Sequence, residues 1–118
     1  ALYPLMEPGR NIVASTRLYG GTVTQFTQVF RKFGWSTKWV DIDDEAAIRA
    51  AIDDDTRAIF CESISNPGGH ITDLPMVARV ANAAGIPLVV DNTSASPYLC
   101  RPIEHGATIV VHSVTKYL

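Results

Sequence analysis

Five short apolar runs alternate along the chain with segments of helical period, and this alternation constrains the fold more than any other feature. Two of the runs, residues 87–91 (PLVVD) and 107–112 (ATIVVH), are almost continuously apolar, which is typical of strands buried on both faces of a parallel sheet. The other three runs are residues 11–15, 37–41 and 57–61. Repeated strand–helix units predict an α/β fold, with a mainly parallel sheet and helices on both faces.

Three segments between these runs have helical period. They are residues 22–33, residues 45–52 and a segment between Asp73 and Gly85. Aspartates precede the second and third segments, where a carboxylate can cap the first backbone N–H groups of a helix. The positions expected to face the sheet are Val23, Phe26, Phe30 and Phe33 in the first helix, Ile48, Ala51 and Ile52 in the second, and Val77, Val80, Ala81 and Ala84 in the third.

The composition excludes several classes of protein. Hydrophobic residues make up 47% of the chain, which suffices for a buried core, and the net charge of -2 with scattered cations argues against a nucleic-acid partner. No apolar run approaches the ~18 residues needed to cross a membrane. Cys61 and Cys100 form no CxxC pair, so a reducing cytoplasm is the simplest setting. His70 and His105 lack ligand-like spacing with the cysteines, and residues 53–55 (DDD) are typical of a solvated turn, so we expect no metal site.

Polar side chains follow four of the five predicted strands. Tyr19 follows the first, residues 62–66 follow the run at 57–61, Asp91 ends PLVVD, and residues 113–116 follow ATIVVH. Ligands of open α/β sheets bind beyond the carboxyl ends of the strands. These polar residues should therefore gather at one rim of the sheet, and this convergence is stronger evidence for a site than any single motif.

Lys116 and Asp91 are the two strongest candidates, and each has an alternative. A lysine just past a buried strand is placed to form a Schiff base if partial burial and nearby cations lower its pKa, but a lone lysine at a helix start is more often solvated. A carboxylate at the end of a buried strand needs a partner. A pyridinium nitrogen would serve Asp91, although capping of the turn that follows it is an equal alternative.

The remaining candidates are weaker on their own. The hydroxyls of Ser113 and Thr115 could hold a phosphate, or could cap a following helix. Tyr19 could stack on a flat ring, while the glycines that follow it are equally typical of a strand–helix turn. Residues 66–69 (NPGG) indicate a turn, and only the convergence at the rim makes Asn66 a candidate.

Four segments together resemble the Cys/Met-metabolism enzymes that depend on pyridoxal phosphate (PLP) and have fold type I. Residues 112–117 (HSVTKY) are similar to the family's lysine signature and residues 90–93 to its VDNT segment. Residues 62–67 (ESISNP) are similar to its ES-x-x-NP segment, and residues 18–22 (LYGGT) to its YGGT segment. All four occur in the family's order. Thr108, where the family usually has an acidic residue, and Ile64, where it often has proline, depart from the pattern.

The resemblance implies specific roles for these residues. Lys116 would bind the cofactor covalently, Asp91 would pair with its pyridine nitrogen, and Asn66 would lie near its 3-oxygen. Ser113 and Thr115 would contact its phosphate. Tyr19 would stack on the ring and help to take a proton from the substrate amine.

The resemblance also implies an activity. Residues 97–107 most resemble O-acetylhomoserine sulfhydrylases. Such an enzyme replaces the acetate of O-acetyl-L-homoserine with sulfide to give L-homocysteine. The resemblance also implies a homo-oligomer, a dimer of dimers, and we expect it in the cytoplasm. The chain would be the central part of the PLP-binding domain, part of the large domain of an aspartate-aminotransferase-like enzyme. The family's upstream phosphate-binding loop and C-terminal domain have no counterpart in these 118 residues, so we expect a longer polypeptide.

Three alternatives remain at this point. The first is a sibling enzyme: cystathionine γ-synthase, methionine γ-lyase or O-succinylhomoserine sulfhydrylase. These enzymes share every residue named above. A non-catalytic nucleotide-binding α/β module would share the fold but bind no PLP. The segment could also be a folded remnant without activity.

Overall fold

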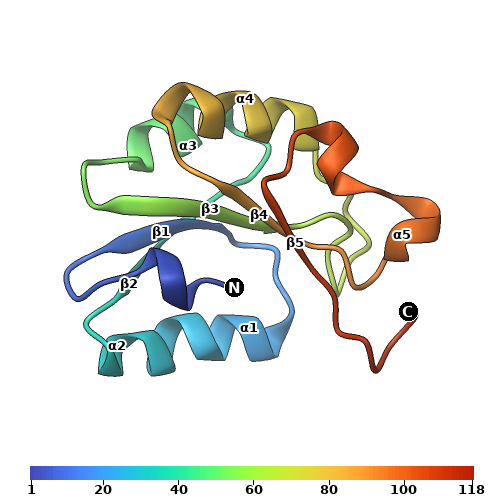
Figure 1. Cartoon of the computed structure of the whole chain (residues 1–118), viewed down its shortest axis with the longest axis horizontal. Helices are drawn as coiled ribbons and strands as arrows, with labels where there is room; N and C mark the ends of the chain where they lie inside the picture. The colour runs from blue at the N-terminus through green and yellow to red at the C-terminus, as the bar shows by residue number, and fades with distance from the viewer.

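The five strands are all parallel and form a single sheet in the order β2-β1-β3-β4-β5. The computed structural model describes residues 1–118 and places helices on both faces of this sheet (Figure 1). The strands are β1 (Asn11–Ser15), β2 (Ser36–Val40), β3 (Thr56–Glu62), β4 (Leu88–Asp91) and β5 (Ile109–Val111). They confirm the predicted fold class and the five predicted strands, whose ends move by a residue or two.

One face of the sheet is covered by a helix that follows β1. It consists of α1 (Gly20–Thr24), a π-helical segment η2 (Gln25–Val29) and α2 (Phe30–Lys32). Phe26 and Phe30 are buried against the sheet with their rings stacked, centroids 4.6 Å apart, and the rings of Phe26 and Phe60 of β3 pack edge to face, with centroids 5.0 Å apart. The prediction that Phe33 faces inward is wrong, because the helix ends at Lys32 and Phe33, its C-cap, is 47% exposed.

The opposite face is covered by α3 (Glu45–Ala51) and α4 (Leu74–Ala84). The carboxylates of Asp44 and Asp73 accept hydrogen bonds from Ala47 N (3.0 Å) and Met76 N (3.1 Å), which confirms both predicted caps. Gly85 ends α4 with φ of 69°, a left-handed conformation that suits glycine. Ala84, predicted to face inward, is exposed in the last turn. Three short helices were not predicted: η1 (Tyr3–Leu5), α5 (Ser96–Leu99) and η3 (Pro102–His105).

The order of the strands reverses between β1 and β3. The chain passes from β1 outward to β2, returns to β3 on the other side of β1, and continues to β4 and β5. As a result, β1 leads into a helix on one face and β3 leads toward α4 on the other (Figure 1). In open α/β sheets, the carboxyl ends of two such strands form the usual ligand-binding position.

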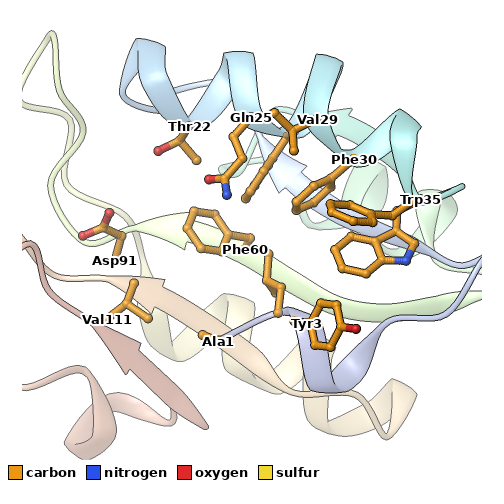
Figure 2. A pocket seen from close by; sticks show the side chains of 13 residues that line it. Ala1, Tyr3, Thr22, Gln25, Val29, Phe30, Trp35, Phe60, Asp91 and Val111 are labelled. Atoms are coloured by element: carbon orange, nitrogen blue, oxygen red, sulfur yellow. The ribbon is translucent and has the colours of Figure 1, made fainter.

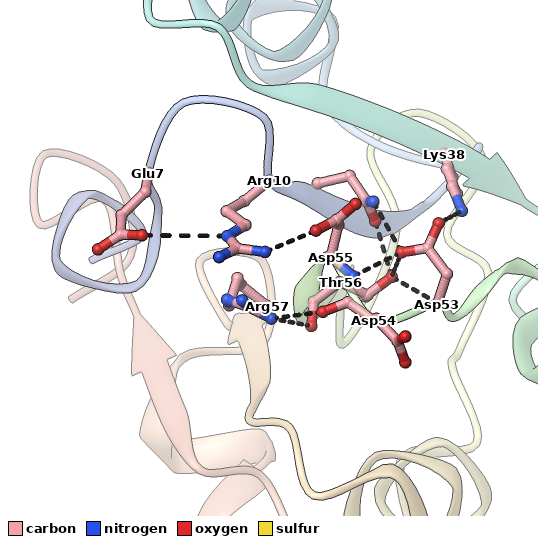
Figure 3. A network of polar contacts seen from close by, with 9 residues as sticks. Glu7, Arg10, Lys38, Asp53, Asp54, Asp55, Thr56 and Arg57 are labelled. Carbon is pink, nitrogen blue, oxygen red and sulfur yellow. Dashed lines mark hydrogen bonds and ion pairs between the residues drawn. The ribbon is translucent and has the colours of Figure 1, made fainter.

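The amino ends of the strands carry a separate network of charges (Figure 3). Asp53 accepts from Lys38 Nζ at 2.5 Å, from Asn11 Nδ2 at 3.0 Å and from the amide of Asp55 at 2.9 Å. Arg10 donates to Asp55 at 2.6 Å. The acidic run is therefore a solvated turn, as predicted, but its carboxylates also connect β1, β2 and the start of β3.

Asp53 should make stability depend on pH. The Lys38 ammonium, with the Asn11 amide and the Asp55 backbone, holds the pKa of Asp53 well below its usual range. Its contribution is therefore present above the unfolded pKa of about 3.9 and is lost as pH falls below that value. Asp53→Asn should show a smaller loss of denaturation midpoint between pH 5 and pH 3 than the parent protein. The control is Asp54→Asn, whose carboxylate has no hydrogen-bond partner; an equal change in both variants would contradict the assignment.

Three further observations bear on the predictions from the sequence. Cys61 and Cys100 are both free; Cys61 is buried in β3, where burial raises the pKa of its thiol to about 12, and Cys100 is half-buried. No group of three His, Cys, Asp or Glu side chains is placed to hold a metal ion. None of the helices combines the length and apolar character needed to cross a bilayer.

Candidate active site at the carboxyl ends of the strands

A polar cavity of about 550 Å³ lies at the carboxyl ends of β3, β4 and β5, beside the start of α1. Five of the six predicted site residues line it, from four separate segments: Tyr19, Asn66, Asp91, Ser113 and Lys116. Thr115 does not line the cavity, but its hydroxyl lies 3.1 Å from the Ser113 hydroxyl. The other lining residues are Glu62, Ser65, Gly68, Gly69, Thr93, Ser94 and Tyr117.

Asp91 uses one carboxylate oxygen for the protein and leaves the other free. Its Oδ1 accepts from the amide of Thr93 at 2.9 Å and from the Thr93 hydroxyl at 2.5 Å. Its Oδ2 has no hydrogen-bond partner in the chain, and the half-buried side chain borders the cavity. The turn-capping interpretation is thus correct for Oδ1, while Oδ2 remains available for a hydrogen-bond donor in the cavity.

Lys116 lies in a turn that is tied to Asp91. The Lys116 amide donates to the Ser113 carbonyl at 3.1 Å, and the Ser113 amide donates to the Thr93 hydroxyl at 2.9 Å. Thr93 therefore links the lysine turn to the aspartate. The lysine side chain is exposed, its amine makes no hydrogen bond within the chain, and no other cationic residue lines the cavity. The burial and neighbouring cations expected for Lys116 are not supplied by these 118 residues.

Tyr19 occupies the N-cap position of α1, and its ring is folded back over the helix start. A Cβ added to Gly21 would lie 2.6 Å from Cε1 of Tyr19, whereas a Cβ on Gly20 would meet nothing within 4 Å. Gly21 thus leaves the space that the ring occupies. The residue is 57% exposed, so one face of the ring is open for stacking.

Asn66 lies in an exposed turn that is fixed from both sides. The Ser65 amide donates to the His70 carbonyl at 2.9 Å, and His70 Nε2 lies 3.0 Å from Oδ1 of Asp43 in the β2–α3 loop. Gly68 and Gly69 have φ of 101° and 63°, which suit glycine. The turn brings Asn66 to the cavity beside Glu62.

Glu62 is a site residue that our reasoning from the sequence did not single out. It ends β3, is only 6% exposed, and its Oε1 and Oε2 accept from the Tyr19 amide at 3.1 and 3.0 Å. Burial, and then the neighbouring charge of Asp91, raise the pKa of Glu62 to about 7 against the opposing effect of the Tyr19 and Asn66 amides. The signal was present in the sequence, because Glu62, like Asp91, is a carboxylate at the end of a buried strand.

Asn92 fixes the segment behind the cavity. It is fully buried, its Oδ1 accepts from the Ser63 hydroxyl at 2.7 Å, and its Nδ2 donates to the Cys100 carbonyl at 2.8 Å. Asn92→Ala would leave the buried Ser63 hydroxyl and the half-buried Cys100 carbonyl without partners, which should cost about 1–3 kcal/mol of stability. Thermal unfolding of the complete protein measures this. The control Asn82→Ala, an exposed position on α4, should change little; equal melting temperatures for both variants would contradict the prediction.

A second, apolar cavity of about 350 Å³ lies between the α1–α2 helix and the sheet (Figure 2). Aromatic side chains dominate its lining, including Phe30, Trp35 and Phe60, while Asp91 and Val111 lie at one end. Asp91 therefore borders both cavities.

Comparison with known proteins places this geometry in a family. The whole chain, residues 1–118, matches the Cys/Met metabolism PLP-dependent enzymes. It is 47% identical over 118 residues to the O-acetyl-L-homoserine sulfhydrylase of Leptospira meyeri, with all of this chain and 27% of that protein aligned. The chain thus spans about a quarter of the length of this relative.

Solved structures agree with this match. A putative O-acetylhomoserine (thiol)-lyase from Campylobacter jejuni, which contains N'-pyridoxyl-lysine-5'-monophosphate, has a TM-score of 0.96 and 39% identity over 98% of this chain and 29% of that one. A cystathionine γ-lyase from Lactobacillus plantarum complexed with L-serine has a TM-score of 0.93 and 39% identity over 98% of this chain and 30% of that one. The fold, the match over the full chain and the identity to these relatives show that the chain belongs to the Cys/Met metabolism PLP-dependent enzymes.

Proposed function

We propose that the chain is the central part of the PLP-binding catalytic domain of an O-acetylhomoserine sulfhydrylase. The complete enzyme would replace the acetate of O-acetyl-L-homoserine with sulfide and release L-homocysteine and acetate. The observation that carries this proposal is the polar cavity, which is lined by Asp91, with an unpaired carboxylate oxygen, and by Lys116, with a free amine, in a chain similar to such sulfhydrylases. Because the chain spans only part of its relatives, the activity is assigned to the complete protein.

The cavity residues fit the cofactor. Asp91 Oδ2 has no protein partner and suits the N–H of a protonated pyridine ring. The Tyr19 ring has an open face for stacking, and Gly21 leaves the space that this ring needs. The hydroxyls of Ser113 and Thr115, 3.1 Å apart, suit phosphate oxygens, and Asn66 can donate to the ring's 3-oxygen. Lys116 supplies the amine for the aldehyde.

When bound, PLP would act as an electron sink for the carbon atoms of an amino-acid substrate. Around it, Lys116 would hold the cofactor and, once free, carry protons to and from the substrate carbons. Asp91 would keep the ring nitrogen protonated through its fixed negative charge. Tyr19 would cover the ring and help to take a proton from the substrate amine.

The substrate assignment has one specific rival. Similarity to a cystathionine γ-lyase structure is as high, at 39% identity, as similarity to the thiol-lyase structure, so cleavage of cystathionine is the second candidate. The complete enzyme should be supplied with O-acetylhomoserine and sulfide, and separately with cystathionine, and its products quantified. Homocysteine formed faster from the first mixture supports the proposal, while faster cleavage of cystathionine would assign the sibling activity.

We also propose a cytoplasmic homo-oligomer, a dimer of dimers, as the working form. Two free cysteines are consistent with a reducing compartment. The exposed Lys116 and the absence of other cations from the cavity lining are consistent with a site completed by groups outside these 118 residues. Mass photometry of the complete enzyme would test the assembly.

A further inference from the structure

Glu62 is the one charged group of the cavity for which the proposed function has no role. The ionisable residues lining the cavity are Tyr19, Glu62, Asp91, Lys116 and Tyr117. Glu62 and Asp91 are register partners on β3 and β4, so both carboxylates project to the same face of the sheet. Two neighbouring carboxylates at a buried rim repel one another, and such an arrangement is costly unless each has a distinct partner.

The carboxylate of Glu62 accepts from the backbone amide of Tyr19, and the Asn66 amide also acts on it. Both carboxylate oxygens lie within 3.1 Å of the Tyr19 amide, and no other acceptor is in reach of that N–H. Glu62 is itself fixed, because its backbone carbonyl accepts from the Thr72 hydroxyl at 2.7 Å and its side chain is buried. A rigid acceptor on β3 therefore holds the residue from which α1 begins.

We propose that Glu62 is a positioning residue: its carboxylate fixes the Tyr19 backbone at the start of α1 and so orients the Tyr19 ring over the cavity. Gly21 also contributes to the position of the ring, since it leaves open the space into which the ring folds. Glu62 acts through Tyr19 and needs no contact with substrate. The inference deepens the proposed function and rests on it, because the value of an oriented Tyr19 ring depends on stacking against the cofactor.

The charge on Glu62 should strengthen its hold on Tyr19, because a hydrogen bond from an N–H group to an ionised carboxylate is about twice as strong as one to a neutral acceptor. Burial and the charge of Asp91 oppose ionisation, so protonation near neutral pH would weaken the bond to Tyr19. A cation paired with Asp91 would remove that repulsion and favour the ionised form. The only cationic side chain facing the cavity is Lys116, and the remaining titratable groups there are the phenols of Tyr19 and Tyr117.

The test uses hydrogen exchange at the Tyr19 amide in the complete protein without cofactor. After correction for intrinsic exchange rates, protection of this amide should rise about tenfold between pH 5.5 and pH 8.5. Glu62→Gln keeps the shape and an oxygen acceptor but cannot ionise, so its protection should be lower and independent of pH. Glu62→Asp, with a shorter carboxylate, should restore part of the pH dependence. The control Glu104→Gln, an exposed carboxylate on η3, should behave as the parent.

A second variant tests the position of the Tyr19 ring separately from the hydrogen bond to its backbone amide. Gly21→Ala favours the helix by about 1 kcal/mol but places a methyl group where the Tyr19 ring lies. It should keep the parent's protection of the Tyr19 amide while weakening PLP binding, measured by equilibrium titration of the cofactor absorbance, by about tenfold. Glu62→Gln should weaken PLP binding to a similar degree.

The outcomes distinguish this inference from the proposed function. The positioning role would be overturned if protection of the Tyr19 amide did not depend on pH in the parent. It would also be overturned if Glu62→Gln kept the parent's pH-dependent protection, even if the enzyme makes homocysteine. If Glu62→Gln fails to fold, Glu62→Asp and the parent still report the pH dependence. If protection behaves as expected while no homocysteine forms, the positioning role holds and the substrate assignment fails.

Discussion

Lys116→Ala should lower the turnover of the complete enzyme by about a thousandfold or more. General acid–base catalysis by a single positioned side chain contributes roughly 10²–10⁴ in rate, and this variant would also lose the amine that holds the cofactor. The side chain is exposed and makes no hydrogen bond within the chain, so its removal should leave the melting temperature of the cofactor-free protein unchanged. Steady-state kinetics with saturating PLP would measure the effect.

The matched control is Lys32→Ala, another exposed lysine, at the end of α2. It should retain full turnover. Borohydride reduction of the parent enzyme, followed by peptide mapping, should place the pyridoxyl label on Lys116. A label on Lys32 or Lys38 instead would show that the cofactor lysine has been assigned wrongly.

Asp91→Asn should lower turnover by roughly a hundredfold or more, because a fixed negative charge is lost where charge develops during the reaction. The structure makes this substitution selective. Asparagine keeps an Oδ1 that can accept from the Thr93 amide and hydroxyl, so the turn cap survives. The Nδ2 group would replace the free Oδ2 and present a donor to the ring nitrogen instead of an acceptor.

Stability provides the control for this variant. Thermal unfolding of Asp91→Asn should match the parent, whereas Asp91→Ala should also destabilise the protein because the Thr93 amide loses its partner. Normal turnover in Asp91→Asn would show that Asp91 acts only as a turn cap.

Most of the fold follows from local signals in the sequence. Buried strands have nearly continuous apolar runs, and the carboxylates of Asp44 and Asp73 mark helix starts, so both kinds of element could be located. Phe33 was misplaced because periodicity assumes an unbroken α-helix, while the helix here contains a π-helical segment and ends one residue earlier. The short helices α5 and η3 were missed since segments of four residues have no measurable period.

The site could be predicted as a convergence of strand ends but not as a geometry. Parallel strands bring their carboxyl ends to one rim, which suffices to collect Tyr19, Asp91 and Lys116. Sequence order cannot show that Asp91 divides its two oxygens between a turn and a cavity, or that Glu62 holds the Tyr19 amide, because those contacts depend on the register between β3 and its neighbours. The sequence also left open whether Lys116 is partly buried or solvated, since burial depends on what packs around a residue in space.

The position of β5 in the sheet has a consequence for the order in which the site is assembled. Within these residues, β5 is short, pairs with β4 alone, and carries the Lys116 turn beyond it. The β4–β5 ladder has three register pairs, against five for β1–β2, and a parallel pairing that short opens more readily than a longer one. Each opening would carry the lysine away from Asp91 while the rest of the sheet stays intact. A cofactor bonded to Lys116 and paired with Asp91 would bridge β5 to β4. It would thus stabilise the pairing of these strands and slow amide exchange in β5.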